Sequence, residues 1–121
     1  MHPTSTVLVV DDNPVMRAYA AGTFRDLGAK VYEAYNGQRA LEILEEHPDI
    51  SLLFADIRMP GLDGHGLAEA ALLRHPDLRV VLTSGYVGET GRAGTSFVPK
   101  PWHRDRLRAL IEDAAHKIDE H

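Results

Sequence analysis

The hydrophobic and polar positions of the chain follow two alternating patterns. Short, mostly apolar runs predict five strands, at residues 7–10, 30–34, 51–55, 78–82 and 96–98. Between most of these runs, and after the last one, apolar residues recur at helical spacing. This spacing predicts helices at residues 14–27, 37–46, 65–74 and 107–118.

The order of these elements predicts an α/β fold. Near-continuous apolar strands that alternate with helices are typical of a parallel sheet with helices on both faces. For five such strands the common arrangement is the flavodoxin-like order 2-1-3-4-5. No repeat, linker or low-complexity segment interrupts the pattern, so we expect residues 1–121 to form a single domain.

One segment departs from the pattern. Between Tyr86 and Thr95 the sequence VGETGRAG contains three glycines. Each glycine in a helix interior costs about 1 kcal/mol relative to alanine. We therefore predict that the fourth helix of the fold, which belongs here, is short, disordered or absent.

Polar side chains follow the apolar strands. They are Asp11 and Asp12 after the first strand, Asp56 after the third, Thr83 and Ser84 after the fourth, and Lys100 after the fifth. In open parallel sheets, ligands bind outside the carboxyl ends of the strands. We expect three carboxylates, one or two hydroxyls and one ammonium to gather at that edge.

This set of groups suits phosphoryl chemistry. Clustered carboxylates repel one another, and a Mg²⁺ ion, which takes oxygen ligands, removes that repulsion. An ammonium and a hydroxyl add the positioning and charge neutralisation that phosphoryl transfer needs. A carboxylate can act as the nucleophile, and Asp56 is the best candidate because it stands alone, whereas Asp11 and Asp12 form a pair.

Each of these residues also has a structural interpretation. An Asp pair before a helix commonly caps that helix, and a lone Asp after a strand is commonly a turn residue. Thr83 could simply end a β-branched strand, and Lys100 could be a solvated loop residue. Their joint placement at successive strand ends favours the functional interpretation.

Composition narrows the classes of function. The formal net charge is -5, with 18 acidic and 13 basic residues, which argues against direct binding to nucleic acid. The chain has no cysteine, no apolar run near the roughly 20 residues that span a bilayer, and no signal-peptide pattern at its start. We expect a cytoplasmic protein without membrane contact.

Four segments resemble the receiver domain of two-component response regulators: VLVVDDN, LLFADIRMPGLDG, VVLTSGY and FVPKPW. The resemblance covers nearly the whole chain and implies a signalling domain, not an enzyme, that assists its own phosphorylation and dephosphorylation. It implies that Asp56 is the phosphoacceptor. It also implies that Asp11, Asp12, Asp56 and the backbone carbonyl of Arg58 hold Mg²⁺.

The resemblance further implies a phosphorylation switch. Thr83 is the implied switch hydroxyl and Phe97 the implied aromatic switch residue, and both turn inward on phosphorylation. Lys100 is implied to contact the phosphoryl group, and the Lys100-Pro101 bond to be cis. Trp102 stands where the family usually has Phe, and we expect it to pack between the last helix and the sheet.

The implied partners are a histidine kinase or phosphotransfer protein, which donates the phosphoryl group, and a downstream protein that the sequence does not identify. We expect a monomer. The polar sequence KIDEH ends the chain, which fits either a stand-alone, chemotaxis-regulator-like receiver or an excised receiver domain.

Three other classes of protein fit the sequence less well. An aspartyl-phosphate phosphatase acting on external substrates commonly has a D-x-D arrangement and a cap domain, whereas Asp11 and Asp12 are adjacent. A binding module with a degenerate, unphosphorylated site is disfavoured by the complete set of acids, Thr83 and Lys100. A flavin-binding function is weaker still, because no phosphate-cradling loop follows the first strand.

Overall fold

The computed structural model describes residues 5–86, 88–92 and 94–119, of which residues 113–119 are described by their backbone alone. The elements are β1 (Thr6–Val10), α1 (Pro14–Asp26), β2 (Lys30–Ala34), α2 (Gly37–Glu46), β3 (Leu52–Asp56), α3 (Gly64–Arg74), β4 (Arg79–Ser84), β5 (Ser96–Pro99) and α4 (Arg104–Asp119). The strands form one parallel sheet in the order β2-β1-β3-β4-β5. The predicted fold class and strand order are confirmed.

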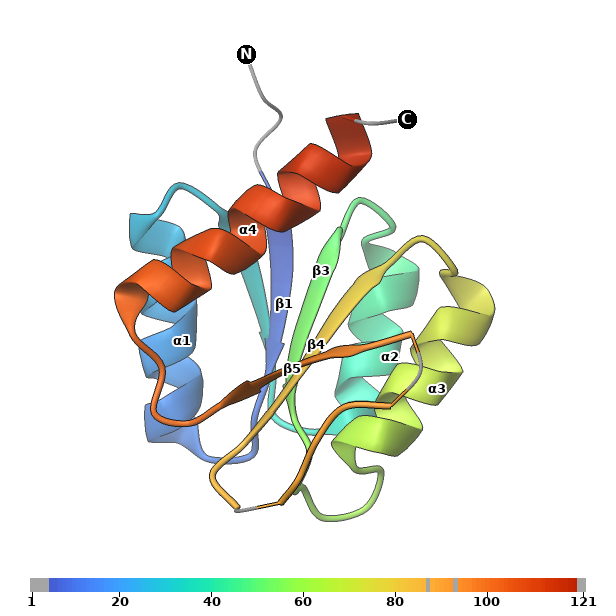
Figure 1. Ribbon diagram of the computed structural model, residues 1–121. Coiled ribbons are helices and arrows are strands. Elements are labelled where there is room, and N and C mark those ends of the chain that lie inside the picture. Colours follow the sequence, from blue (N-terminus) through green and yellow to red (C-terminus); the bar gives the residue numbers. More distant parts are fainter. Residues whose placement is uncertain (1–4, 87, 93, 120–121) are drawn as a thin grey trace.

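Helices cover both faces of the sheet, with α1 and α4 on one face and α2 and α3 on the other (Figure 1). Successive side chains of a strand point to opposite faces, so each central strand contributes to two apolar cores. Leu8 and Leu53 pack with α2 and α3, whereas Val9 and Phe54 pack with α1 and α4. Burial of both cores fixes the register of the sheet.

The same alternation decides which polar side chains share a face beyond the strands. Asp11, Asp56, Thr83 and Lys100 each come two residues after an apolar residue of the core under α1 and α4. Those apolar residues are Val9, Phe54, Val81 and Val98, respectively. The four polar side chains therefore continue one face of the sheet past its carboxyl edge.

Three strands end later than the sequence predicted, and β5 does so by one residue, at Pro99. β3 reaches Asp56 and β4 reaches Ser84, and Asp56 pairs in register with Thr83. The apolar pattern stops earlier, at residues 55 and 82, but a strand is held by backbone hydrogen bonds that polar residues also make. Asp56 and Thr83 are therefore strand residues rather than loop residues, and the sheet itself fixes their relative position.

The segment between β4 and β5 contains no helix among residues 85–86, 88–92 and 94–95. Gly88 and Gly94 have φ values of +90° and +83°, a conformation that right-handed helices do not contain and that glycine adopts most readily. The prediction of a short or absent fourth helix is confirmed for these residues, and residues 87 and 93 lie outside the described part. The helix labelled α4 is the last one predicted from the sequence.

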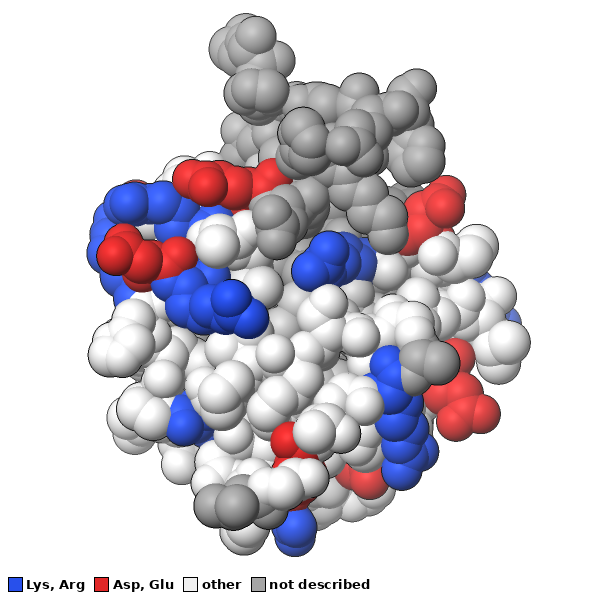
Figure 2. Space-filling model, in the orientation of Figure 1, with Lys and Arg blue, Asp and Glu red and all other residues white. Residues whose placement is uncertain are grey.

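The surface shown in Figure 2 carries charges of both signs. Lysine and arginine side chains lie among aspartate and glutamate side chains, and neither sign covers this face continuously. Among the residues that the structure describes, no helix is long and apolar enough to cross a membrane.

Candidate functional site

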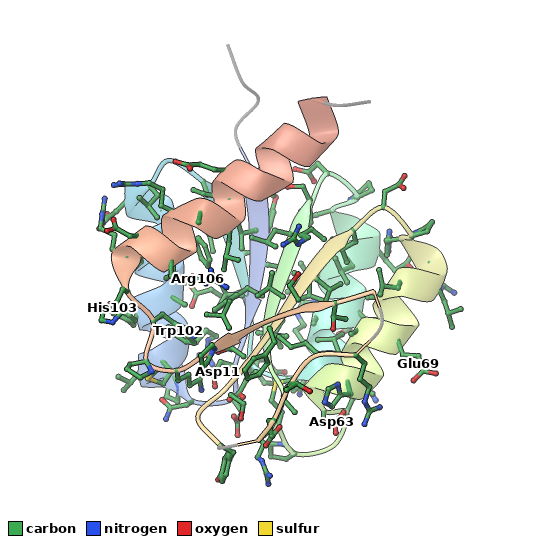
Figure 3. The ribbon with its side chains drawn as sticks, in the orientation of Figure 1. Asp11, Asp63, Glu69, Trp102, His103 and Arg106 are labelled. Atoms are coloured by element: carbon green, nitrogen blue, oxygen red, sulfur yellow. The ribbon has the colours of Figure 1, made fainter. Side chains whose placement is uncertain are left out.

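Three carboxylates lie together at the carboxyl edge of the sheet. One oxygen from each of Asp11, Asp12 and Asp56 lies within 4.8 Å of the other two. Asp11 and Asp56 are buried, with 2% and 8% of their surface exposed, whereas Asp12 is exposed. Asp11 lies just beyond the end of β1 (Figure 3). The structure thus brings the three predicted acids together and shields two of them from water.

Backbone amides orient the two buried acids. The Asn13 amide donates a hydrogen bond to Asp11 Oδ1 at 2.9 Å, and the Arg58 amide donates one to Asp56 Oδ1 at 3.2 Å. Asn13 is fixed in turn because its side chain caps α1. Each acid therefore has one oxygen held by the loop that follows its strand.

The Lys100 ammonium joins the other oxygens of these acids. Its Nζ lies 3.1 Å from Asp56 Oδ2 and 3.5 Å from Asp11 Oδ2. Only 18% of the Lys100 side chain is exposed, so water screens this attraction less than at the surface. One ammonium against two buried carboxylates leaves the cluster with excess negative charge.

The electrostatic cost of this arrangement appears at Asp11. Burial raises the pKa of its carboxyl above the ordinary value of 3.8. The Asn13 hydrogen bond and the Lys100 charge oppose this increase, while the Asp56 charge adds to it. A cation placed among these oxygens would favour the ionised form and remove the penalty.

Gly64 allows α3 to begin directly against the end of β3. A Cβ atom at this position would lie 2.5 Å from the Asp56 carbonyl oxygen and 2.7 Å from Ile57 Cα, too close for any side chain. The Gly64 amide donates a hydrogen bond to the Ile57 carbonyl at 2.9 Å. This close approach helps to hold the backbone on which Asp56 stands, a role beyond that of a turn residue.

Thr83 is 1% exposed and lies opposite Asp56 in the sheet. Its Oγ1 accepts a hydrogen bond of 2.7 Å from Trp102 Nε1. Sequence reasoning predicted that Trp102 would be packed but missed this bond. The residue type could have indicated that Trp102 makes a hydrogen bond, because a buried indole N–H requires an acceptor. Ser84 instead accepts a hydrogen bond from the Tyr86 amide at 3.1 Å, so its hydroxyl is bound to the loop that follows β4.

Phe97 and Thr83 lie on opposite faces of the sheet. Phe97 is half-buried and packs against the core under α2 and α3, paired in register with Leu82, whereas Thr83 contacts Trp102 of the other core. Inward movement of both residues would therefore affect both layers of the fold.

The Lys100-Pro101 bond is cis, in agreement with the resemblance.

The Arg58 side chain connects two loops beside the acids. Its guanidinium forms an ion pair with Glu89 and lies 3.9 Å from the centre of the Tyr86 ring. The hydrogen bond with Glu89 raises the pKa of Arg58 above its ordinary value. Sequence reasoning considered only the Arg58 carbonyl, because the ion pair with Glu89 joins residues 31 positions apart.

Comparison with known proteins identifies the family. The model of the response regulator receiver domain matches residues 7–112. The chain belongs to this family. The receiver domain carries the phosphoacceptor role in two-component signalling, and receiver domains bind Mg²⁺ at an acidic pocket.

Individual relatives agree with this assignment. The chain is 30% identical to the sensor kinase CckA of Brucella abortus over 96% of its length, which is 13% of that protein. It is 34% identical to the nitrogen assimilation regulatory protein NtrX of Azorhizobium caulinodans over 89% of its length, 25% of that protein. The chain thus spans a quarter or less of both relatives.

A solved structure also matches. The receiver domain of the hybrid histidine kinase CckA superposes with a TM-score of 0.81 and is 34% identical, over 92% of this chain and 99% of that one. The receiver fold therefore accounts for nearly the whole chain.

Proposed function

We propose that Asp56 is the phosphoacceptor of this receiver domain. The observation that carries the proposal is the environment of its carboxylate, 3.1 Å from Lys100 Nζ and within 4.8 Å of oxygens of Asp11 and Asp12. The Arg58 amide holds the other oxygen. Asp11 shares these neighbours, but Asp56 lies nearer to the ammonium, at 3.1 Å against 3.5 Å, and is itself a strand residue paired in register with Thr83.

The donor set fits a magnesium ion. All three side chains offer carboxylate oxygens, the ligands that Mg²⁺ prefers, and the two buried acids carry more negative charge than Lys100 neutralises. Asp11, Asp12 and Asp56 would hold the ion together with the backbone carbonyl of Arg58. When bound, it would neutralise charge on the phosphoryl oxygens.

The proposed donor is a phosphohistidine of a histidine kinase or phosphotransfer protein. An Asp56 carboxylate oxygen attacks phosphorus, the phosphorus–nitrogen bond breaks, and the imidazole nitrogen keeps the electron pair. The product is an acyl phosphate on Asp56. Lys100 then pairs with one phosphoryl oxygen, and the Thr83 hydroxyl donates a hydrogen bond to another.

Phosphorylation is proposed to shift the domain between two conformations. The charge added at Asp56 favours the conformation in which Thr83 and Phe97 turn inward, and this alters the surface offered to a downstream protein. The domain assists its own phosphorylation and dephosphorylation and does not turn over external substrates. A monomeric state and a cytoplasmic location stay predictions from the sequence.

Labelling with a small phosphodonor tests the proposal. With acetyl phosphate and Mg²⁺, intact-mass measurement should find one added phosphoryl group on the wild-type chain. Asp56→Asn should abolish the addition, because an amide is not a nucleophile, whereas Asp77→Asn, at an exposed position, should leave it unchanged. Full labelling of Asp56→Asn would contradict the assignment, and turnover of an added phosphomonoester would favour the phosphatase alternative.

A further inference from the structure

The hydrogen bond between Trp102 and Thr83 is isolated from water at both ends. Trp102 is 4% exposed and Thr83 is 1% exposed, and the Nε1-to-Oγ1 distance is 2.7 Å. An indole N–H can only donate, so Thr83 Oγ1 is necessarily the acceptor. No hydrogen bond joins Thr83 Oγ1 to Asp56 or Lys100 in the described structure.

Packing fixes the indole in this position. The Trp102 ring meets Phe54 edge to face, with centroids 5.1 Å apart, and stacks against Tyr19 of α1 at 6.2 Å. The ring belongs to the core shared with Leu107 of α4. Because the ring is held on several sides, Trp102 cannot easily follow Thr83 if the hydroxyl turns toward Asp56.

Turning Thr83 toward a phosphoryl group on Asp56 therefore has a specific cost. The indole N–H would be left buried without a partner, which is unfavourable unless another acceptor or water reaches it. A phenylalanine at the same position would carry no donor, and the same rotation would leave no unsatisfied group. The indole thus favours the unphosphorylated orientation of Thr83.

We propose that Trp102 is a positioning residue. Its hydrogen bond holds the Thr83 hydroxyl away from Asp56 until phosphorylation of Asp56 favours rotation of the hydroxyl toward the phosphoryl group. This inference rests on the proposed role of Asp56 as phosphoacceptor. Trp102 raises the free energy of the active conformation relative to the inactive one. Trp102 thereby sets how strongly a phosphoryl group, or a mimic of one, must interact with the site in order to shift the domain to the active conformation. Its ring also lies 5.5 Å from Lys100 Nζ, a contact that an aromatic ring at the same position retains.

Beryllium fluoride with Mg²⁺ is the probe for the first test, because it forms a phosphoryl-like adduct on an acceptor carboxylate. Its affinity is measured by titration followed by ¹⁹F NMR. Trp102→Phe keeps an aromatic ring and removes the donor, and it should tighten binding roughly 5- to 10-fold, as expected for release of one buried hydrogen-bond donor. In a Thr83→Val background, Trp102→Phe should leave the affinity unchanged, because the acceptor is already missing.

The second test uses the wild-type chain. Trp102 is its one tryptophan, so a single indole N–H resonance reports on this bond. On addition of beryllium fluoride and Mg²⁺, the resonance should shift toward its position in Thr83→Val, and its exchange with solvent should accelerate. This readout does not depend on how well the Trp102→Phe variant packs.

The outcomes separate the two proposals. Weaker or equal beryllium fluoride binding by Trp102→Phe, or an indole resonance that stays unchanged when the adduct forms, would overturn the role of Trp102 and leave Asp56 as phosphoacceptor. Failure of the wild-type chain to bind the probe would overturn the proposed function and this inference together.

Discussion

Lys100 Nζ lies 3.1 Å from Asp56 Oδ2, although the two residues are separated by 44 positions in the sequence. The contact exists because β3 and β5 flank β4 in the sheet and all three carry polar residues at their carboxyl ends. It places a fixed positive charge beside the proposed nucleophile before any phosphoryl group arrives. Such preorganisation avoids the cost of recruiting a charge during the transfer.

Removal of this charge should slow phosphorylation. Lys100→Met keeps much of the side-chain length but removes the ammonium, and labelling by acetyl phosphate should slow by about tenfold, the effect of losing one charge-assisted hydrogen bond. Lys100→Arg, which retains a cation, should lose less. Rates come from intact-mass time courses. Equal rates for Lys100→Met and wild type would show that the ammonium does not assist the transfer.

Mg²⁺ should stabilise the folded protein. The ion binds the acid cluster of the folded state and finds no such cluster in the unfolded chain, so the melting temperature should rise with its concentration. Asp12→Ala removes one proposed ligand and should weaken this rise, and without metal it should slightly stabilise the fold by relieving repulsion. Differential scanning fluorimetry measures both effects. A magnesium shift that survives loss of both Asp11 and Asp12 would place the ion elsewhere.

The raised pKa of Asp11 predicts a dependence of stability on pH. The folded state holds this proton to higher pH than the unfolded chain does. The contribution of Asp11 to stability is therefore full below about pH 3.8 and is lost as the pH rises through the folded-state pKa. In metal-free buffer, Asp11→Asn should therefore become more stable than the wild type as the pH rises from about 3.8 through the folded-state pKa of Asp11, because the amide stays uncharged. Urea unfolding at several pH values measures the difference in free energy of unfolding between Asp11→Asn and the wild type. If that difference does not change with pH, ionisation of Asp11 is not the cause of the gain in stability.

The Arg58 side chain should restrain the segment between β4 and β5. Arg58→Ala removes the ion pair with Glu89 and the contact with Tyr86, so amide hydrogen exchange at residues 88–92 should accelerate. Arg74→Ala, which removes an exposed ion pair with Glu45 elsewhere, serves as the control. Unchanged exchange in Arg58→Ala would show that the segment is held by other contacts. High salt should reproduce part of the effect of Arg58→Ala, because the Arg58 side chain is exposed.

The fold and the acid cluster could be predicted from local features of the sequence. Apolar runs located the strands, and the parallel topology then required Asp11, Asp56, Thr83 and Lys100 to meet at one edge. The three glycines between Tyr86 and Thr95 indicated in the same local way that the fourth helix would be short, disordered or absent.

Features that depend on side-chain packing between distant segments could not be predicted in this way. The Trp102 indole reaches Thr83 only because Phe54 and Tyr19 hold the ring in place. The strand pairing of Asp56 with Thr83 extends past the apolar pattern through backbone hydrogen bonds that no side-chain periodicity reveals. The partners of Arg58 likewise come from a segment without regular secondary structure.

If Asp56 carries the phosphoryl group, direct mapping of the phosphorylated residue will locate it there. After labelling with acetyl phosphate and Mg²⁺, borohydride reduction converts an acyl phosphate into a stable alcohol, and peptide mass spectrometry locates the modified position. We expect modification at position 56 alone. Modification at Asp11, Asp12 or any other carboxylate, with position 56 intact, would contradict it.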